Sequence, residues 1–166
     1  GTTLSQLCDR LGAYTQDSVL AALVDNKLKA LDYKIINPHN VCFIGYDHPD
    51  GRRTYIRSLC FVLQRVIREM YPDKILVIDY SLPSGLYCEI REIKPMEDGR
   101  PSVYFATDDE LQKIEDRMLE LIDADLVFTK KMLSLEECET LFSRNGQMAK
   151  VNLLKSSYVN AVDANG

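Results

Sequence analysis

The 166-residue sequence lacks several features that would assign it to a functional class at once. No apolar run approaches the 18 residues typical of a membrane-spanning helix, and no signal peptide is recognisable, so we expect no membrane partner. The G-x-x-x-x-G-K-[ST] phosphate loop, the G-x-G-x-x-G dinucleotide fingerprint and the G-x-S-x-G nucleophile elbow do not occur. The residues therefore point to no catalytic class of their own.

Cysteine is present but in no recognisable arrangement. There is no C-x-x-C pair, and the number of cysteines is odd, so neither a zinc site nor a disulfide framework is indicated. Each cysteine has apolar neighbours in the sequence, which predicts buried thiols in a reducing cytoplasm. These residues are Cys8, Cys42, Cys60, Cys88 and Cys138.

Histidine is scarce, which limits acid–base chemistry near neutral pH. The only two, His39 and His48, both lie in turn-forming stretches, and we expect exposed turn side chains. A weak metal site built from His48 with Asp47 and Asp50 is the alternative, but adjacent turn residues rarely supply a closed ligand set. We therefore expect no metal and no resident cofactor in this region.

The composition that remains is that of a globular protein. Hydrophobic residues make up 46% and charged residues 27%, while 20 basic against 25 acidic residues give a net charge of −5. This acidic balance disfavours a general nucleic-acid binder, but it is compatible with a local basic patch on the surface. Because the chain begins with Gly1 and ends in a polar tail, we expect it to be a piece of a longer cytoplasmic protein.

The first 49 residues have the pattern of a small α+β unit. Thr3 and Gln6 form a capping-box pattern that predicts a helix ending at Gly12. Two apolar runs around Asp25-Asn26 predict a tight hairpin. A strand over 41–44 follows, and a turn-rich hinge over 46–51 predicts a domain boundary. We expect a β-grasp-like domain over 1–49 and a second α+β domain over 50–166.

The second domain is predicted to be built around a long helix. Apolar spacing over 56–70 predicts a mostly buried helix, followed by a buried strand over 74–78, a turn at 83–85 and a half-buried strand over 86–91. Residues 94–102 predict a loop. Two further capping boxes begin helices at Thr107 and Ser134, the second stopping at Gly146, before a last amphipathic turn that carries Met148, Val151 and Leu154.

Arginines gather near the start of the long helix and along it. On a helix Arg57, Gln64 and Arg68 fall close to one stripe, with Arg65 beside it. Such a cluster fits bidentate binding of phosphate or carboxylate, and a solvated face with salt bridges to acidic helices is the alternative. The cluster consists of Arg52, Arg53, Arg57, Arg65 and Arg68.

These stretches carry a family resemblance. Residues 1–44 resemble the TGS domain, the β-grasp module at the start of threonyl-tRNA synthetases, whose opening hairpin would precede Gly1. Residues 63–73, 83–89, 108–122, 134–137 and 150–153 resemble, in the same order, the second additional domain of those synthetases. The resemblance implies an α+β fold of a TGS-like unit followed by an editing-domain-like unit, which we expect to be truncated at its C-terminal end.

In the synthetases that domain hydrolyses mischarged seryl-tRNA with an H-x-x-x-H motif on its first helix. The matching positions are Arg57 and Phe61, neither of which is a neutral imidazole base or a metal ligand. We therefore expect no catalytic residue and a remodelled pocket that binds a small anion, a nucleotide or RNA. Its expected residues are Arg52, Arg53, Arg57, Phe61 and Tyr87, with Arg65 and Arg68 as phosphate contacts.

Residues 51–63 also resemble the corresponding helix of bacterial nucleoside (uridine) kinases, in which a TGS domain and the synthetase-like domain precede a P-loop kinase domain. The resemblance implies an accessory or regulatory region of a phosphotransferase, with ATP and Mg²⁺ belonging to the kinase domain. That C-terminal domain is then the expected partner, and a homo-oligomer is left open.

Three alternatives remain. The chain could be the N-terminal region of an actual threonyl-tRNA synthetase that has lost editing. It could be an RNA-binding module in which the arginine cluster contacts phosphates, with a steep salt dependence. Hydrolysis by this region alone is the third alternative, and it requires groups that Arg57 and Phe61 do not supply.

Overall fold

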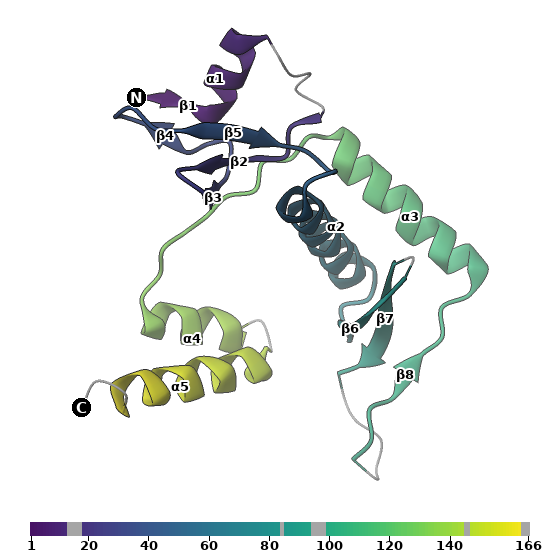
Figure 1. Ribbon diagram of the computed structural model, residues 1–166. Helices are drawn as coiled ribbons and strands as arrows, with labels where there is room; N and C mark the ends of the chain where they lie inside the picture. Colours follow the sequence, from purple (N-terminus) through teal and green to yellow (C-terminus); the bar gives the residue numbers. More distant parts are fainter. Residues whose placement is uncertain (13–17, 84, 94–98, 145–146, 164–166) are drawn as a thin grey trace. The chain divides into compact units, whose positions relative to one another are not determined.

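The protein has a mixed α+β architecture of small antiparallel sheets and helices (Figure 1). The computed structural model describes residues 1–12, 18–83, 85–93, 99–144 and 147–163. Within these residues there are three small antiparallel sheets and five α-helices. The chain divides into two compact units, Gly1–Asp125 and Leu126–Gly166. The predicted α+β class is therefore confirmed.

The first helix, α1 (Leu4–Leu11), begins and ends where its local sequence predicts. The Thr3 hydroxyl accepts from the Gln6 amide at 3.2 Å, and the Gln6 side chain accepts from the Thr3 amide at 3.1 Å. Gly12 closes the helix with a φ of 58°, a left-handed conformation that glycine adopts at low cost. A short strand, β1 (Thr2–Thr3), precedes the helix and pairs with β4 (Lys34–Ile35).

The predicted hairpin forms between β2 (Ala21–Val24) and β3 (Lys27–Lys29). Asp25 and Asn26 have φ values of 47° and 62°, as a two-residue hairpin turn with both central residues left-handed requires. The predicted strand β5 (Val41–Ile44) pairs with the other edge of β2, which gives the sheet order β3-β2-β5. Helix α1 packs on this sheet through a buried cluster that contains Leu4, Cys8, Val19, Ala22, Val24 and Phe43.

The long helix α2 (Pro49–Met70) begins earlier than the sequence predicts. His48 is its N-cap, because its Nδ1 accepts from the Asp50 amide at 3.1 Å, and Pro49 occupies the first helical position, where its missing N–H costs nothing. The predicted hinge over 46–51 is therefore wrong in its second half, which is the first turn of a helix. The predicted boundary between residues 49 and 50 lies inside the first unit and stays a prediction.

The third sheet, with order β6-β7-β8, follows α2. Strand β6 (Lys74–Leu82) is separated from the end of α2 by three residues and pairs with β7 (Gly85–Glu92), so that Leu76 lies opposite Ile90. The short β8 (Val103–Tyr104), which the sequence pattern does not indicate, pairs with β7. Part of the predicted loop over 94–102 and Ser84 of the predicted turn lie outside the described residues.

The second core lies where α2, the β6–β7 sheet and α3 (Asp108–Asp123) meet. Val66 and Ile67 of α2 and Ile114 and Leu121 of α3 are buried, and Leu76 and Ile90 of the sheet pack against them. The apolar spacing along α3 predicts that Leu111 and Ile122 belong to its inner face, but both side chains are about half exposed. The core is therefore smaller than the apolar pattern predicts.

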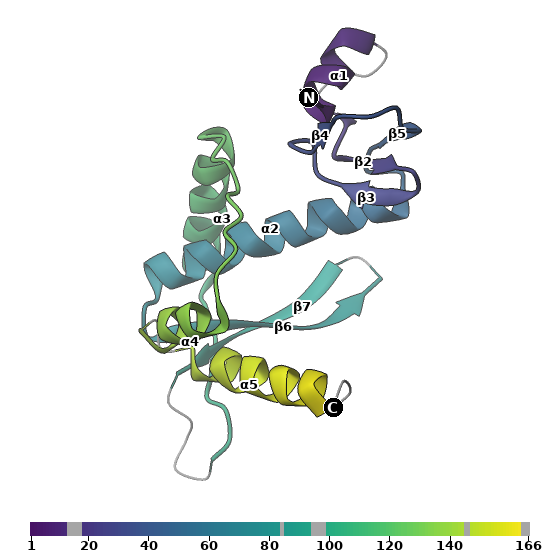
Figure 2. The ribbon, with the colours of Figure 1, turned by 90° about the vertical axis from the view of Figure 1, so that its left-hand side faces the viewer.

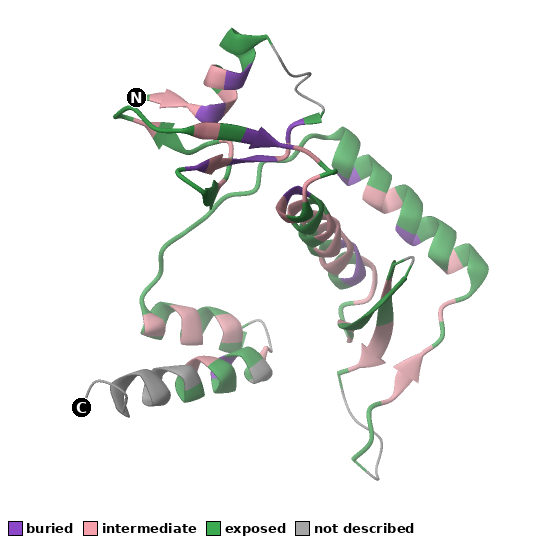
Figure 3. Cartoon of the chain, in the orientation of Figure 1, coloured by how far each residue is buried: buried purple, intermediate pink, exposed green. Residues whose placement is uncertain are grey.

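Two burial predictions in this region are wrong. Helix α2 was expected to be mostly buried, but only Gly51, Val66 and Ile67 are, and the β6 stretch expected to be a buried strand is half-buried or exposed along its length (Figure 3). The hydrophobic residues are present, but apart from Gly51 the buried positions of α2 lie near its end, and β6 packs against that core through Leu76 near its beginning. Apolar periodicity identifies the hydrophobic face of a helix or strand, but it does not identify the element that packs against that face.

The second unit contains two packed helices, α4 (Leu135–Arg144) and α5 (Met148–Asp163). The predicted capping box is present, since Ser134 Oγ accepts from the Glu137 amide at 3.2 Å and Glu137 accepts from the Ser134 amide at 2.7 Å. Helix α5 is longer than the predicted single turn, and Val151 is its one buried side chain among those described. Gly146, the predicted stop, lies outside the described residues.

The prediction of five buried thiols is wrong. Cys8 alone is buried, Cys60 and Cys138 are half-buried, and Cys42 and Cys88 are exposed. Cys42 and Cys88 lie on strands that have one or both faces open to solvent, so apolar neighbours along the sequence did not translate into burial in the fold.

Candidate anion-binding surface on helix α2

One side of α2 carries five exposed residues that we call the α2 stripe. They follow one another at intervals of four, four, four and three residues, the spacing that places side chains on the same side of a helix. Val66 and Ile67 lie in the core, with Arg53 at the margin of the stripe nearest to it, so packing fixes which side of α2 faces solvent. The stripe consists of Arg53, Arg57, Phe61, Arg65 and Arg68.

At the start of α2 the two consecutive arginines already have partners. The Arg52 guanidinium lies over the Tyr46 ring, 5.3 Å from its centroid, and the Tyr55 ring meets the Tyr46 ring edge-on at 5.4 Å. Arg53 forms an ion pair with Asp50 at 3.5 Å, with its side chain 61% exposed. A pair so exposed contributes little stability, so Arg53 can exchange Asp50 for another anion at low cost.

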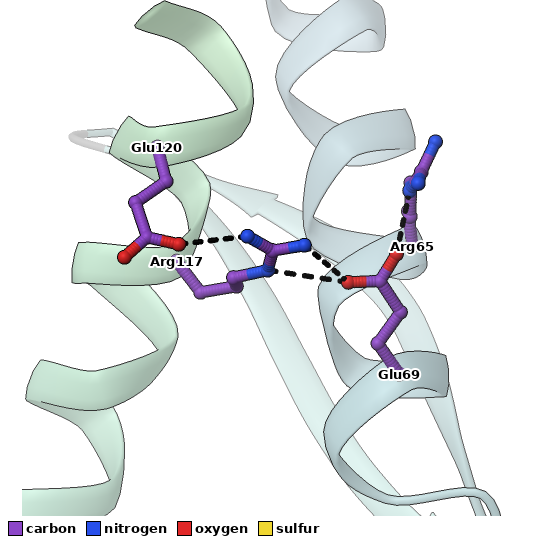
Figure 4. Close-up of polar contacts among 4 residues, drawn as sticks. All are labelled: Arg65, Glu69, Arg117 and Glu120. Atoms are coloured by element: carbon purple, nitrogen blue, oxygen red, sulfur yellow. Dashed lines mark hydrogen bonds and ion pairs between the residues drawn. The ribbon is translucent and has the colours of Figure 1, made fainter. Parts of the chain in front are cut away.

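Farther along the stripe, Arg65 belongs to an ion-pair network between α2 and α3 (Figure 4). Its Nε donates to Glu69 Oε1 at 2.7 Å, and Arg117 of α3 donates to Glu69 Oε2 at 3.1 Å and to Glu120 at 2.7 Å. Arg65 and then Arg117 lower the pKa of Glu69. An incoming phosphate at Arg65 would have to displace this carboxylate, which disfavours Arg65 as a primary contact.

Arg57 and Arg68 differ from the other arginines of α2. Within the described part of the chain, neither side chain forms a hydrogen bond or an ion pair. They lie eleven residues apart, so their backbones are separated by about 16 Å along the helix. A single small anion therefore contacts one of them, whereas an extended polyanion reaches both.

The two aromatic residues predicted for the pocket lie in different places. Phe61 is in the α2 stripe with 61% of its surface exposed. Tyr87 is on β7, stacked on Tyr80 with ring centroids 4.8 Å apart, and its hydroxyl donates to Glu89 at 3.0 Å, which raises the pKa of Tyr87. Side chains alternate along a strand, so Tyr87 faces away from the sheet surface on which its neighbour Cys88 lies.

The most strongly shifted carboxylate is Glu110, at the start of α3. The Tyr104 hydroxyl donates to it at 2.5 Å, Thr107 donates through its amide at 2.9 Å and its hydroxyl at 3.0 Å, and the Tyr71 hydroxyl donates at 3.3 Å. These donors, Tyr104 first, lower the pKa of Glu110 from 4.5 to about 2. Perturbed carboxylates often mark active sites, but here the donors fasten the N-terminus of α3 to the sheet. We interpret Glu110 as a structural residue.

Replacing Glu110 with Gln is expected to reduce the pH dependence of stability. The folded-state pKa lies below the unfolded value, so the ionised carboxylate stabilises the fold above pH 4.5, and this contribution is lost as the pH falls towards 2. Urea-unfolding midpoints measured from pH 6 to 2.5 should converge for the native chain and E110Q. Y104F, which removes the largest donor, should fall between them, and parallel curves would contradict this account.

The two histidines have local structural roles. His39 Nδ1 lies 2.6 Å from an Asp25 oxygen, and the other oxygen accepts from the Asn40 amide, which together lower the pKa of Asp25. His48 caps α2, a role that the sequence interpretation as a turn residue missed, although the following Pro49 was a signal for it. The described residues contain no group of three His, Cys, Asp or Glu side chains placed to hold a metal ion.

A groove that the sequence did not indicate lies in the second unit. It has a volume of about 490 Å³ and runs along α4, with Leu133 and Leu141 among charged side chains. Glu137, on its wall, is already bound to the Ser134 amide. The groove is lined by Lys131, Leu133, Glu136, Glu137, Thr140, Leu141 and Arg144.

Comparison with known proteins shows a distant similarity to threonine–tRNA ligases. The ligase of Acetivibrio thermocellus is 25% identical over 155 residues, which is 93% of this chain and 23% of the ligase. The ligase of Coxiella burnetii is 23% identical over 153 residues, and that of Hyphomonas neptunium is 28% identical over 135 residues. The chain thus matches about a fifth to a quarter of the length of these relatives, in their N-terminal part. No family model matches.

No helix in the described ranges combines the length and the apolar character needed to cross a bilayer.

Proposed function

We propose that this chain is a non-catalytic accessory region that binds phosphate-bearing ligands through the α2 stripe. The observation that carries the proposal is that Arg57 and Arg68 project from one side of α2 without an internal partner in the described residues. Guanidinium groups stay protonated and match phosphate geometry with two parallel hydrogen bonds. The similarity to the N-terminal part of threonine–tRNA ligases supports an auxiliary role.

The side chains of the stripe favour binding over hydrolysis. A guanidinium does not accept a proton near neutral pH, and the Phe61 ring offers no heteroatom. Neither residue can act as the general base that hydrolysis of an ester requires. The α2 stripe is therefore suited to holding an anion.

We also propose that the chain folds as a TGS-like unit followed by an editing-domain-like unit. The α1 helix on the β3-β2-β5 sheet is consistent with a TGS-like β-grasp unit, and the α2, α3 and β6–β8 elements with an editing-domain-like unit. The support is the order of the elements together with a distant match over 93% of the chain. A homo-oligomer and a cytoplasmic location belong to the same proposal.

We propose two kinds of full-length protein to which this region could belong. The resemblance of residues 51–63 supports an ATP-dependent nucleoside (uridine) kinase, whose kinase domain would bind ATP and Mg²⁺ and be the partner of this region. The matches to threonine–tRNA ligases support a ligase that has lost editing. The reading frame that encodes the chain decides between them, because a P-loop motif downstream supports the kinase and class II synthetase motifs support the ligase.

Binding measurements test the anion site and identify its ligand class. UTP and a single-stranded RNA oligonucleotide are titrated by calorimetry into the native chain, R57Q and R68Q at low salt. Because Arg57 and Arg68 are about 16 Å apart, a mononucleotide should lose affinity, roughly tenfold, in only one variant, whereas RNA should lose affinity in both. RNA binding should also weaken steeply as salt rises.

R10Q is the matched control, since Arg10 is an exposed arginine on α1, outside the α2 stripe. It should bind both probes as the native chain does. If neither probe binds, or if R57Q and R68Q both bind like R10Q, the α2 stripe is a solvated helix face and the proposal fails.

A further inference from the structure

Two cysteines lie on the facing surfaces of α2 and β7. On β7, Ile90 packs against the core and Cys88 is two residues away, so both side chains lie on the face of the sheet that meets α2. On α2, Cys60 precedes the buried Ile67 by seven residues, which is close to two full turns, so both lie on the side that meets the sheet.

The direction of the elements brings these positions together. Only Tyr71–Asp73 separates the end of α2 from the start of β6, so β6 runs back along the helix and the turn of the hairpin lies towards the beginning of α2 (Figure 2). The step from Ile67 back to Cys60 and the step from Ile90 back to Cys88 therefore lead in the same direction. Each thiol faces the other element beyond the edge of the core.

Two further observations agree with this placement. The pKa of Cys88 is raised by burial and then by the Cys60 thiol, so the two groups are within electrostatic reach. Neither thiol is sealed in the core, since Cys60 is half-buried and Cys88 is exposed. A small reagent can therefore reach the pair.

We propose that Cys60 and Cys88 form a reversible disulfide that ties α2 to the β6–β7 hairpin under oxidising conditions. The thiolate of exposed Cys88 attacks a sulfur of a low-molecular-weight disulfide such as oxidised glutathione, and one glutathione thiolate leaves. The Cys60 thiolate then attacks the Cys88 sulfur of the mixed disulfide and expels the second glutathione. Two protein thiols are oxidised, one glutathione disulfide is reduced to two thiols, and the two protons pass to them.

The other cysteines are placed differently. Cys8 is on α1 and buried in the first core, Cys42 is on β5 of the β3-β2-β5 sheet, and Cys138 is on α4 of the second unit. The raised pKa of Cys88 keeps most of this thiol protonated at neutral pH, so the bond should form faster at higher pH. In a reducing compartment both thiols stay free, which makes the bond a response to oxidation and not a permanent staple.

The test is thiol mapping of the native chain treated with excess oxidised glutathione at pH 8. We expect Cys60 and Cys88 to lose their free thiols without retaining glutathione, whereas an exposed thiol without a neighbouring cysteine, such as Cys42, retains a glutathione adduct. Tryptic digestion should yield one cross-linked species joining residues 58–65 to residues 75–91, and reduction should separate it. Because this measurement uses the native sequence, it does not depend on any variant folding.

Serine variants provide the controls. C60S should stop at a glutathione adduct on Cys88, C88S should form no intramolecular bond, and C42S should cross-link like the native chain. The proposal is overturned if glutathione accumulates on Cys88 of the native chain without closure, or if the disulfides that form join different molecules. In either case the two sulfurs do not approach within bonding geometry, which requires Cα atoms no more than about 7 Å apart.

Discussion

Replacing Ile67 with Ala is expected to lower the free energy of unfolding by about 3–4 kcal/mol, through lost apolar contacts and a cavity that neighbouring side chains fill only in part. Ile67 is 1% exposed and lies in the cluster of buried residues shared by α2 and α3. Small domains are stable by roughly 5–15 kcal/mol, so this one change removes a large fraction. Urea unfolding followed by circular dichroism measures the loss.

Ile75→Ala is the matched control, because it removes the same atoms from a side chain that is 46% exposed on β6. Its cost should stay below about 1 kcal/mol, the range of intrinsic strand preference. Equal costs for the two variants would mean that the cluster around Ile67 is not the core of this region.

The Ile67→Ala variant also tests the predicted domain boundary between residues 49 and 50. The two buried clusters share no residue, one lying between α1 and the β3-β2-β5 sheet and the other between α2, α3 and β6–β7. If they are separate domains, amide hydrogen exchange in Ile67→Ala should quicken in α3 and stay unchanged in β2. Equal acceleration in both would show one cooperative domain and remove the boundary.

Replacing Gly51 with Ala is expected to destabilise the protein by about 2 kcal/mol, although alanine is the better helix former by about 1 kcal/mol. Gly51 is buried in the first turn of α2, and a Cβ there would overlap the carbonyl oxygen of Gly45. That oxygen belongs to the backbone just before the helix, so it cannot move aside as a flexible side chain would. The overlap should therefore outweigh the gain in helix propensity.

Gly85→Ala serves as the control, since a Cβ at Gly85 meets no atom within 4 Å. Its unfolding midpoint in urea should remain near that of the native chain. A stabilised Gly51→Ala would show that α2 can shift away from Gly45, and that the close approach between β5 and α2 is not fixed.

Local chemistry was predictable where the residues that decide it are neighbours in the sequence. The Thr3, Thr107 and Ser134 caps and the Asp25-Asn26 turn form as predicted, because a side chain reaches a backbone amide only a few residues away. The early start of α2 also had a local signal, in His48 before Pro49. These features depend on short-range hydrogen bonds and backbone preferences alone.

The candidate site was predictable in part. The sequence and the repeat of 3.6 residues per turn predict that the arginines share one side of α2, but they do not predict the partners of these side chains. Glu69 binds Arg65, while Arg57 and Arg68 have no internal partner in the described residues. Tyr87 was grouped with Arg57 by resemblance, whereas the strand alternation turns it to the other side of the sheet from Cys88. Which side chains become neighbours across a helix and a sheet depends on how segments that are distant in the sequence pack together.

The sequence by itself determined the element types, the caps, the tight turn and the row of positive charge, because each depends on contacts within about one turn of chain. The tertiary structure alone decided which apolar faces are covered, since burial needs a second element at the right place. It left much of α2 and β6 open, confined the second core to the contacts of Val66, Ile67, Ile114 and Leu121, and exposed Cys42 and Cys88. The physical reason is that hydrophobic periodicity is a property of one segment, whereas burial is a property of two.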